Sequence, residues 1–150
     1  MMLGGGGSSR LWIRLREKGG LSYDVRSWID WNSRELHSVW SASAIFAPSN
    51  LKAAEDAMAD EIAKALAQGF TEEELRDAKA GLLNFRRLSR AQDGSLAGRL
   101  ATDLNLGRTM AWSAELDRAI GQVTLEQANA ALRRHLKPSA FVTGVGGDFK

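Results

Sequence analysis

The sequence predicts an α+β domain in which an antiparallel or mixed sheet carries its helices on one face. Three patterns predict this class: alternation of apolar and polar residues over 21–31, a second strand-like run over 37–47, and helical periodicity over most of 50–136. The chain has 150 residues, of which 44% are apolar and 25% charged, as is typical of a folded protein with a core. A chain of this length is expected to form a single domain, residues 1–150.

The first part of the chain is expected to form a short helix and a hairpin. A helix is predicted over residues 10–18, because Ser8 or Ser9 can cap its start and two glycines follow its end. The alternating residues 21–31 then predict a strand. A polar turn separates this strand from the run over 37–47, so the two strands are expected to pair as an antiparallel hairpin.

Helical patterns dominate the rest of the chain. An amphipathic helix is predicted over residues 50–68, and a capping box of Thr71 and Glu74 begins a long helix whose buried face includes Phe85. Further helices are expected over residues 95–106, from Ser113, and from Thr124 to Leu136. Residues 139–147 read as a final strand, and three strands make a thin sheet for so many helices. We therefore expect the beginning of the domain to be missing.

Composition excludes several classes of function. The chain has no cysteine, so disulfides and thiolate metal sites are excluded and the compartment stays open. No apolar run of about 18 residues occurs, so no membrane-spanning helix is expected. Basic residues exceed acidic ones by two and are mixed with them, and even the cluster over 85–90 is expected to be a solvated helix face rather than a nucleic-acid surface.

The four glycines near the start, in "LGGGGSSRL", admit three interpretations. A phosphate-binding loop would need a lysine after the glycines, and a dinucleotide loop would need a strand before them. A flexible tether is compatible with a glycine-serine composition. The third interpretation is a turn that belongs to the fold, and the residues after the run favour it.

No metal or nucleophile motif stands out. Neither His37 nor His135 has a histidine or carboxylate at the helical spacing of a zinc site, and no G-x-S-x-G motif occurs. We therefore predict no metal ligands and no bound cofactor in this chain. The residues alone lead only to an α+β domain.

Three motifs resemble the insulinase/pitrilysin family of zinc metallopeptidases. They are "LGGGGSSRLWIRLREKGGLSYDV" near the start, "GFTEEELRDAKAGLLNFRR" in the middle and "VTLEQANAALRRHLKP" near the end. The resemblance covers nearly the whole chain and makes the glycines a turn of the fold. Because the family's H-x-x-E-H zinc motif is absent, it implies the C-terminal, non-zinc-binding half-domain, truncated at its N-terminus.

The resemblance also implies partners. Zinc is expected in a partner half, on the same polypeptide or a separate one, and a peptide is the expected substrate. This chain alone is expected to be inactive, with neither nucleic acid nor a membrane as a partner. The missing opening strand would leave an unpaired sheet edge, where a second copy of the chain could pair.

In the family, an arginine and a tyrosine of this half assist the zinc half, and the matching positions here are Arg16 and Tyr23. The implied roles are to bind the peptide and to stabilise the negatively charged transition state. A plainer interpretation makes Arg16 a helix-end cation and Tyr23 a half-buried strand residue. At the level of the whole protein, the alternative is a catalytically inert structural or peptide-clamping subunit of the same fold.

Overall fold

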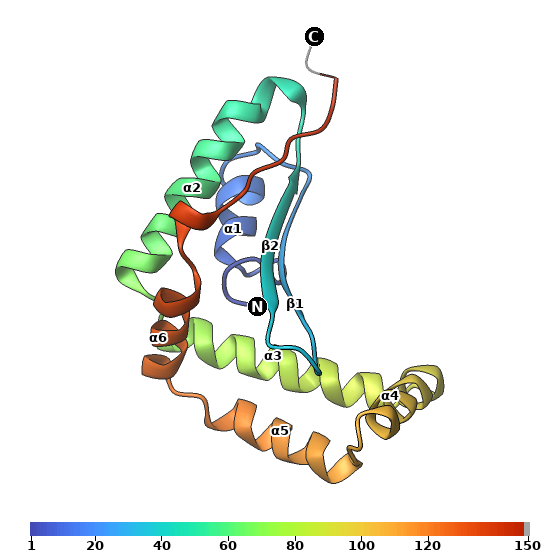
Figure 1. Ribbon diagram of the computed structural model, residues 1–150. Helices are drawn as coiled ribbons and strands as arrows, with labels where there is room; N and C mark the ends of the chain where they lie inside the picture. The colour runs from blue at the N-terminus through green and yellow to red at the C-terminus, as the bar shows by residue number, and fades with distance from the viewer. Residues whose placement is uncertain (149–150) are drawn as a thin grey trace. The chain divides into compact units, whose positions relative to one another are not determined.

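The computed structural model describes residues 1–148 and confirms the α+β class (Figure 1). Its elements in chain order are α1 (Arg10–Trp12), β1 (Asp24–Trp31), β2 (Ser38–Ile45), α2 (Leu51–Gln68), α3 (Glu72–Arg90), α4 (Asp93–Asn105), α5 (Met110–Gln122) and α6 (Leu125–His135). The chain packs as two compact units. The first combines Met1–Phe70 with residues 129–148, and the second is Thr71–Ala128.

The first unit is built on the predicted hairpin. β1 and β2 pair antiparallel from Asp24 opposite Ile45 to Trp31 opposite Ser38. Helix α1 contacts both β1 and α2, and the two helices lie on the same side of the hairpin (Figure 1). The apolar core between these elements consists of Leu11, Leu15, Val25, Ala54, Ala57, Ile62 and Ala65.

Helix α2 has the predicted extent and ends at Gly69, whose φ of +75° is a left-handed value that favours glycine. The following residue is held by the side chain of Asn129. The Phe70 N–H donates to Asn129 Oδ1 at 2.7 Å, and Asn129 Nδ2 donates to the Phe70 carbonyl at 3.3 Å. Arg10 Nη2 donates to the Gly69 carbonyl at 2.7 Å. These bonds join three distant parts of the sequence.

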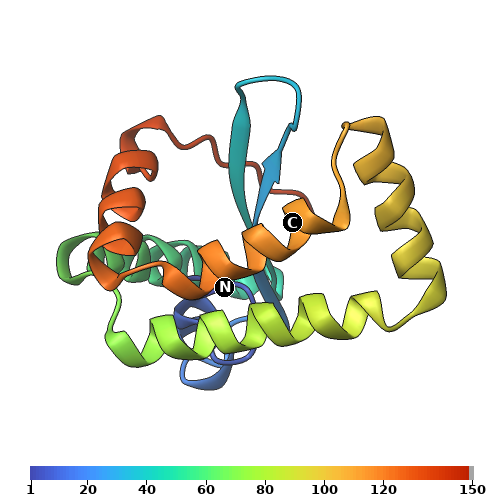
Figure 2. The same cartoon turned by 90° about the horizontal axis from the view of Figure 1, so that it is seen from below.

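The second unit contains α3, α4 and α5, and Figure 2 shows α4 turning away from the end of α3 and α5 returning alongside α3. The predicted capping box is present, with both Thr71–Glu74 bonds formed. The predicted start of α5 at Ser113 is wrong by one turn. Thr109 is the extended residue before the helix, so the helix begins at Met110. The predicted burial of Phe85 is also wrong, because that ring is 66% exposed.

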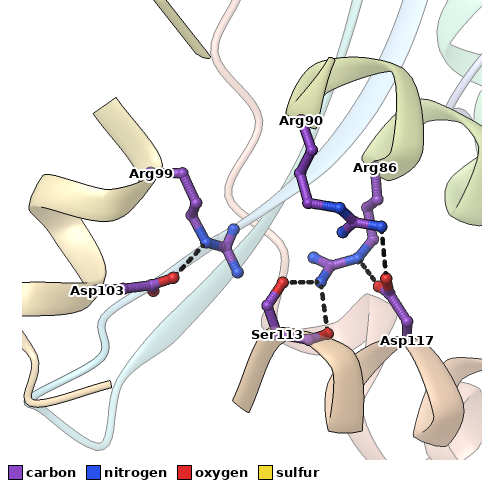
Figure 3. Close-up of polar contacts among 6 residues, drawn as sticks. All are labelled: Arg86, Arg90, Arg99, Asp103, Ser113 and Asp117. Atoms are coloured by element: carbon purple, nitrogen blue, oxygen red, sulfur yellow. Dashed lines mark hydrogen bonds and ion pairs between the residues drawn. The ribbon is translucent and has the colours of Figure 1, made fainter. Parts of the chain in front are cut away.

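Polar contacts connect the helices of this second unit (Figure 3). Asp117 of α5 accepts hydrogen bonds from two arginines of α3, Arg86 through Nε and Arg90 through Nη2. Arg86 Nη2 also donates to the hydroxyl of the buried Ser113 at 3.1 Å. Leu75 is the only large apolar residue among Thr71–Ala128 that is buried, and these ion pairs contribute to the packing of α5 on α3.

The third strand predicted over residues 139–147 is wrong. Pro138–Ala140 form a 3-10 turn, and residues 141–146 continue without joining the two-stranded sheet. A strand requires a neighbour for its main-chain groups, and no strand among residues 1–148 lies against this segment. None of the helices in the same range is long and apolar enough to cross a bilayer.

The turn after the first helix depends on Gly20, which has a φ of +58°. We expect Gly20→Ala to lower the free energy of unfolding by about 1–2 kcal/mol, because an L side chain is strained in the left-handed region. Gly98→Ala is a matched control: a Cβ meets no atom within 4 Å at either position, but Gly98 lies inside α4. That change should stabilise its helix by about 1 kcal/mol. Urea unfolding measures the change in unfolding free energy for both variants. Equal changes would contradict a left-handed conformation at Gly20.

Candidate functional site

The candidate site lies at the junction of the first helix with β1. Helix α1 continues as a π-helical turn (Ile13–Glu17), which places Arg16 near its end. The left-handed Gly20 then reverses the chain, and the Leu21 N–H donates to the Leu15 carbonyl at 2.8 Å to close the helix. The chain can therefore enter β1 directly beside the helix it has just left.

Arg16 and Tyr23 are brought together by this reversal. The Arg16 guanidinium lies 5.4 Å from the centre of the Tyr23 ring, and its Nη1 donates to the Tyr23 carbonyl at 2.7 Å. On its other side the guanidinium lies 4.4 Å from the centre of the Trp12 ring. Two aromatic faces and one carbonyl thus fix the direction of this exposed cation.

Tyr23 lies just before β1 and is anchored by its main chain. Its N–H donates to the Ile45 carbonyl at 2.8 Å, whereas its side chain is 77% exposed. The phenol makes no hydrogen bond within residues 1–148, so its O–H is available to an external acceptor. The expected pair is adjacent and solvent-accessible, and its catalytic roles stay a prediction.

An open groove of about 780 Å³ lies beside the pair and is lined by the glycine run, Trp12 and part of β1. Neither Arg16 nor Tyr23 is among the residues that line this groove. The glycine run is a packed turn. The Ser27 N–H donates to the Gly4 carbonyl at 2.6 Å, and a Cβ on Gly4 would come within 2.8 Å of that nitrogen.

Sequence reasoning missed two side chains at this site. Trp12 lies one helical turn before Arg16, and this i, i+4 spacing was the available signal for their contact. Ser22 is buried, and its hydroxyl lies 2.8 Å from the Asp24 carbonyl and 2.7 Å from the Ile45 carbonyl. Its single O–H lies between these two carbonyls, one on each strand, and holds the chain where Tyr23 emerges. Nothing in the sequence distinguishes Ser22 from other serines.

Metal-ligating side chains do not gather here. Within residues 1–148 no three histidine, cysteine, aspartate or glutamate side chains lie close enough together to hold a metal ion. His37 Nδ1 instead lies 3.1 Å from Glu35 Oε2 on the exposed hairpin turn. The chemistry that Arg16 and Tyr23 offer is hydrogen-bond donation and a positive charge.

Comparison with known protein families identifies the family to which the chain belongs. Residues 1–82, which include the glycine run and both predicted site residues, match the family described as "Peptidase M16 inactive domain". The chain belongs to the peptidase M16 inactive domain family. This confirms the resemblance to zinc metallopeptidases and to their half that does not carry the zinc.

The peptidase M16 inactive domain of this chain is related in sequence to zinc proteases. An uncharacterized zinc protease of Mycobacterium tuberculosis is 34% identical over 149 residues, which is 97% of this chain and 32% of the relative. A mycobacterial counterpart in Mycobacterium bovis has the same identity and coverage. The chain therefore spans about a third of the length of the curated relatives it matches.

Solved structures agree with the M16 assignment. A peptidase M16 inactive domain from Pseudomonas fluorescens is 27% identical and superposes with a TM-score of 0.75 over 91% of this chain and 32% of the other. The periplasmic protease PqqL from Escherichia coli is 20% identical, with a TM-score of 0.66 over 83% of this chain and 14% of the other. The latter supports the fold alone.

Proposed function

We propose that this M16 domain is the auxiliary half of a zinc-dependent peptidase, with Arg16 and Tyr23 acting on the peptide that a zinc-bearing half cleaves. Inactive domains of the family pair with active halves, and the zinc belongs to the active half. The zinc half would supply the metal-activated water. This chain would supply a cation and a hydroxyl donor.

The observation that carries the proposal is the exposed Arg16–Tyr23 pair. When water attacks a peptide carbonyl, negative charge develops on the carbonyl oxygen, and a phenol O–H aimed at it stabilises the transition state more than the substrate. Tyr23 has such an O–H facing solvent, on a main chain held by Ile45. Kinetics of Tyr23→Phe in a complex with a zinc half test the proposal.

Arg16 would bind the peptide itself. Its planar guanidinium has five N–H donors and uses one of its terminal nitrogens on the Tyr23 carbonyl. The remaining donors can bind peptide carbonyl oxygens, and the flanking rings of Trp12 and Tyr23 keep the guanidinium oriented. An oriented donor loses less conformational entropy on binding than a free side chain.

The second candidate function is a catalytically inert structural or peptide-clamping subunit. The bond from Arg16 to the Tyr23 carbonyl favours it, because that contact alone would justify an arginine at the end of the helix. In that case Tyr23→Phe would leave the turnover of the assembled protein unchanged.

The isolated chain is expected to hydrolyse no peptide and to bind no catalytic zinc, because residues 1–148 hold no cluster of metal-ligating side chains that could activate a water. Peptide hydrolysis and zinc content of the purified chain measure this directly. Zinc-dependent cleavage that a chelator abolishes would contradict the assignment to an auxiliary half.

A further inference from the structure

A surplus of positive charge gathers around α5 in the second unit. Four arginines contact the side chains of this helix: Arg86, Arg90, Arg99 and Arg108. The first two bind Asp117, and Arg99 Nε donates to Asp103 Oδ2 at 3.1 Å. Figure 3 shows Arg99 of α4 pointing toward the two arginines of α3. The cluster thus holds four cations and two carboxylates, so its net charge is positive.

One indole ring orients two of these arginines. The guanidinium carbon of Arg108 lies 4.2 Å from the centre of the Trp112 ring, and that of Arg99 lies 5.7 Å from it. The Trp112 side chain is half-buried, which restricts its own motion. A guanidinium that stacks on an aromatic face directs its N–H donors outward in the plane of the group, where they can bind an oxyanion.

The chain before α5 holds Arg108 at this position. Gly107 has a left-handed φ of +65° after α4, and the Arg108 N–H donates to the Asp103 carbonyl at 2.7 Å. No ion pair or side-chain hydrogen bond of Arg108 occurs within residues 1–148, so its guanidinium donors are available to a ligand. Arg99 uses its Nε on Asp103, and its terminal nitrogens make no hydrogen bond among the same residues.

Two exposed leucines of α4 border the arginines. Leu100 is 46% exposed and Leu104 is 81% exposed. They follow Arg99 and Asp103 in the sequence and lie four residues apart, so they form the adjoining stripe of the helix. The surface therefore offers two kinds of binding group, cationic donors and an apolar stripe beside them.

We propose that the surface formed by Arg99, Arg108, Leu100 and Leu104 binds an acidic amphipathic helix of a partner protein. Two carboxylates one turn apart on that helix would bind the two guanidiniums through charge-assisted hydrogen bonds. Apolar side chains beside the carboxylates would cover the two leucines. The surface belongs to the second unit, whereas the candidate site belongs to the first, so this binding is independent of the proposed catalytic role.

Other anionic ligands fit this surface less well. A single-stranded nucleic acid would stack its bases on an aromatic face, but the Trp112 ring is half-buried and already stacks with the guanidinium of Arg108. An inorganic phosphate ion would bind the arginines but leave Leu100 and Leu104 in contact with water. A helix that carries both carboxylates and apolar side chains satisfies both parts of the surface.

The test titrates a synthetic peptide into the isotope-labelled 150-residue chain. The peptide has about 16 residues, mainly alanine and glutamine so that it can form a helix, and carries two glutamates four positions apart, each followed by a leucine. We expect a Kd below about 1 mM, with shifts of the NMR signals of the Leu104 and Arg108 amides and of the Trp112 indole N–H. The same peptide with glutamine in place of both glutamates should bind about tenfold or more weakly.

Two variants of the chain locate the contact. Arg108→Gln removes a charge and should weaken binding of the glutamate peptide about fivefold or more, and Leu104→Ala should weaken it as well. Arg118→Gln is the matched control and should leave binding unchanged, because the Arg118 side chain of α5 is 68% exposed and pairs with Glu115 at 3.9 Å. Equal affinity of the two peptides, unchanged affinity of either variant, or no binding at millimolar peptide would overturn the proposal. So would inorganic phosphate that binds as tightly as the peptide.

Discussion

Tyr23→Phe should lower the turnover number of the assembled peptidase by about 10²-fold or more, which is the scale for losing one oxyanion donor. The substitution removes only the hydroxyl, and the side chain is 77% exposed. Changes at such surface positions usually alter the free energy of unfolding by less than about 0.5 kcal/mol. The rate of peptide cleavage and the urea midpoint of the variant measure the two effects separately.

Arg16 provides the companion measurement. Arg16→Ala should raise the KM for peptide, because it removes the donors proposed to bind the peptide carbonyls. Arg26→Ala is a suitable control, since Arg26 is also an exposed arginine of this region and, among residues 1–148, forms its ion pair with the neighbouring Asp24. An unchanged KM for Arg16→Ala, together with unchanged turnover for Tyr23→Phe, would assign the chain to the structural class.

Asp117→Ala should destabilise the second unit by about 2–3 kcal/mol, as expected for removing hydrogen bonds between charged groups. The change leaves Arg86 and Arg90 without their shared carboxylate, and the Arg86 side chain is only 13% exposed. Glu115→Ala on the same helix is the control, because Glu115 is 67% exposed and lies 3.9 Å from Arg118. Its cost should stay below about 0.5 kcal/mol. Hydrogen exchange of the α5 amides measures the destabilisation caused by each of the two variants.

The same ion pairs make the second unit sensitive to acid. Burial would raise the pKa of Asp117, but hydrogen bonds from Arg86 and Arg90 outweigh it and hold the pKa below its usual value. A carboxylate with a lowered folded-state pKa contributes stability above its unfolded pKa of about 4 and loses it as the pH falls through the folded value. The stability difference between wild type and Asp117→Asn should therefore narrow below about pH 4. A constant difference would contradict the role of the charge.

Local sequence signals predicted those structural features that depend only on neighbouring residues. The capping box of Thr71 and Glu74, the glycine that ends α2 and the alternation in the hairpin each act within a few residues, and all are present. The strand expected over 139–147 failed because pairing depends on a neighbour, which no pattern within the segment can supply. The buried face of α3 failed at Phe85 because the position of the other helices, rather than periodicity, decides exposure.

At the candidate site, too, the local features followed from the sequence and the distant contacts did not. Arg16 and Tyr23 lie together because Gly20 reverses the chain between them, and this reversal is a local property. The family resemblance, rather than the spacing, suggested their roles. The stacking of Trp12 on Arg16 and the anchoring bonds of Ser22 depend on how the helix meets the hairpin, so they became visible only in the fold.

Reconstitution tests the auxiliary role most directly. The measurement is the peptidase rate of a zinc-bearing M16 half with and without this chain. We expect the wild-type chain to raise the rate by about 10²-fold or more, and the Tyr23→Phe chain to bind equally well but raise the rate far less. A rate that is the same without the chain, with it and with the Tyr23→Phe variant would contradict the auxiliary role.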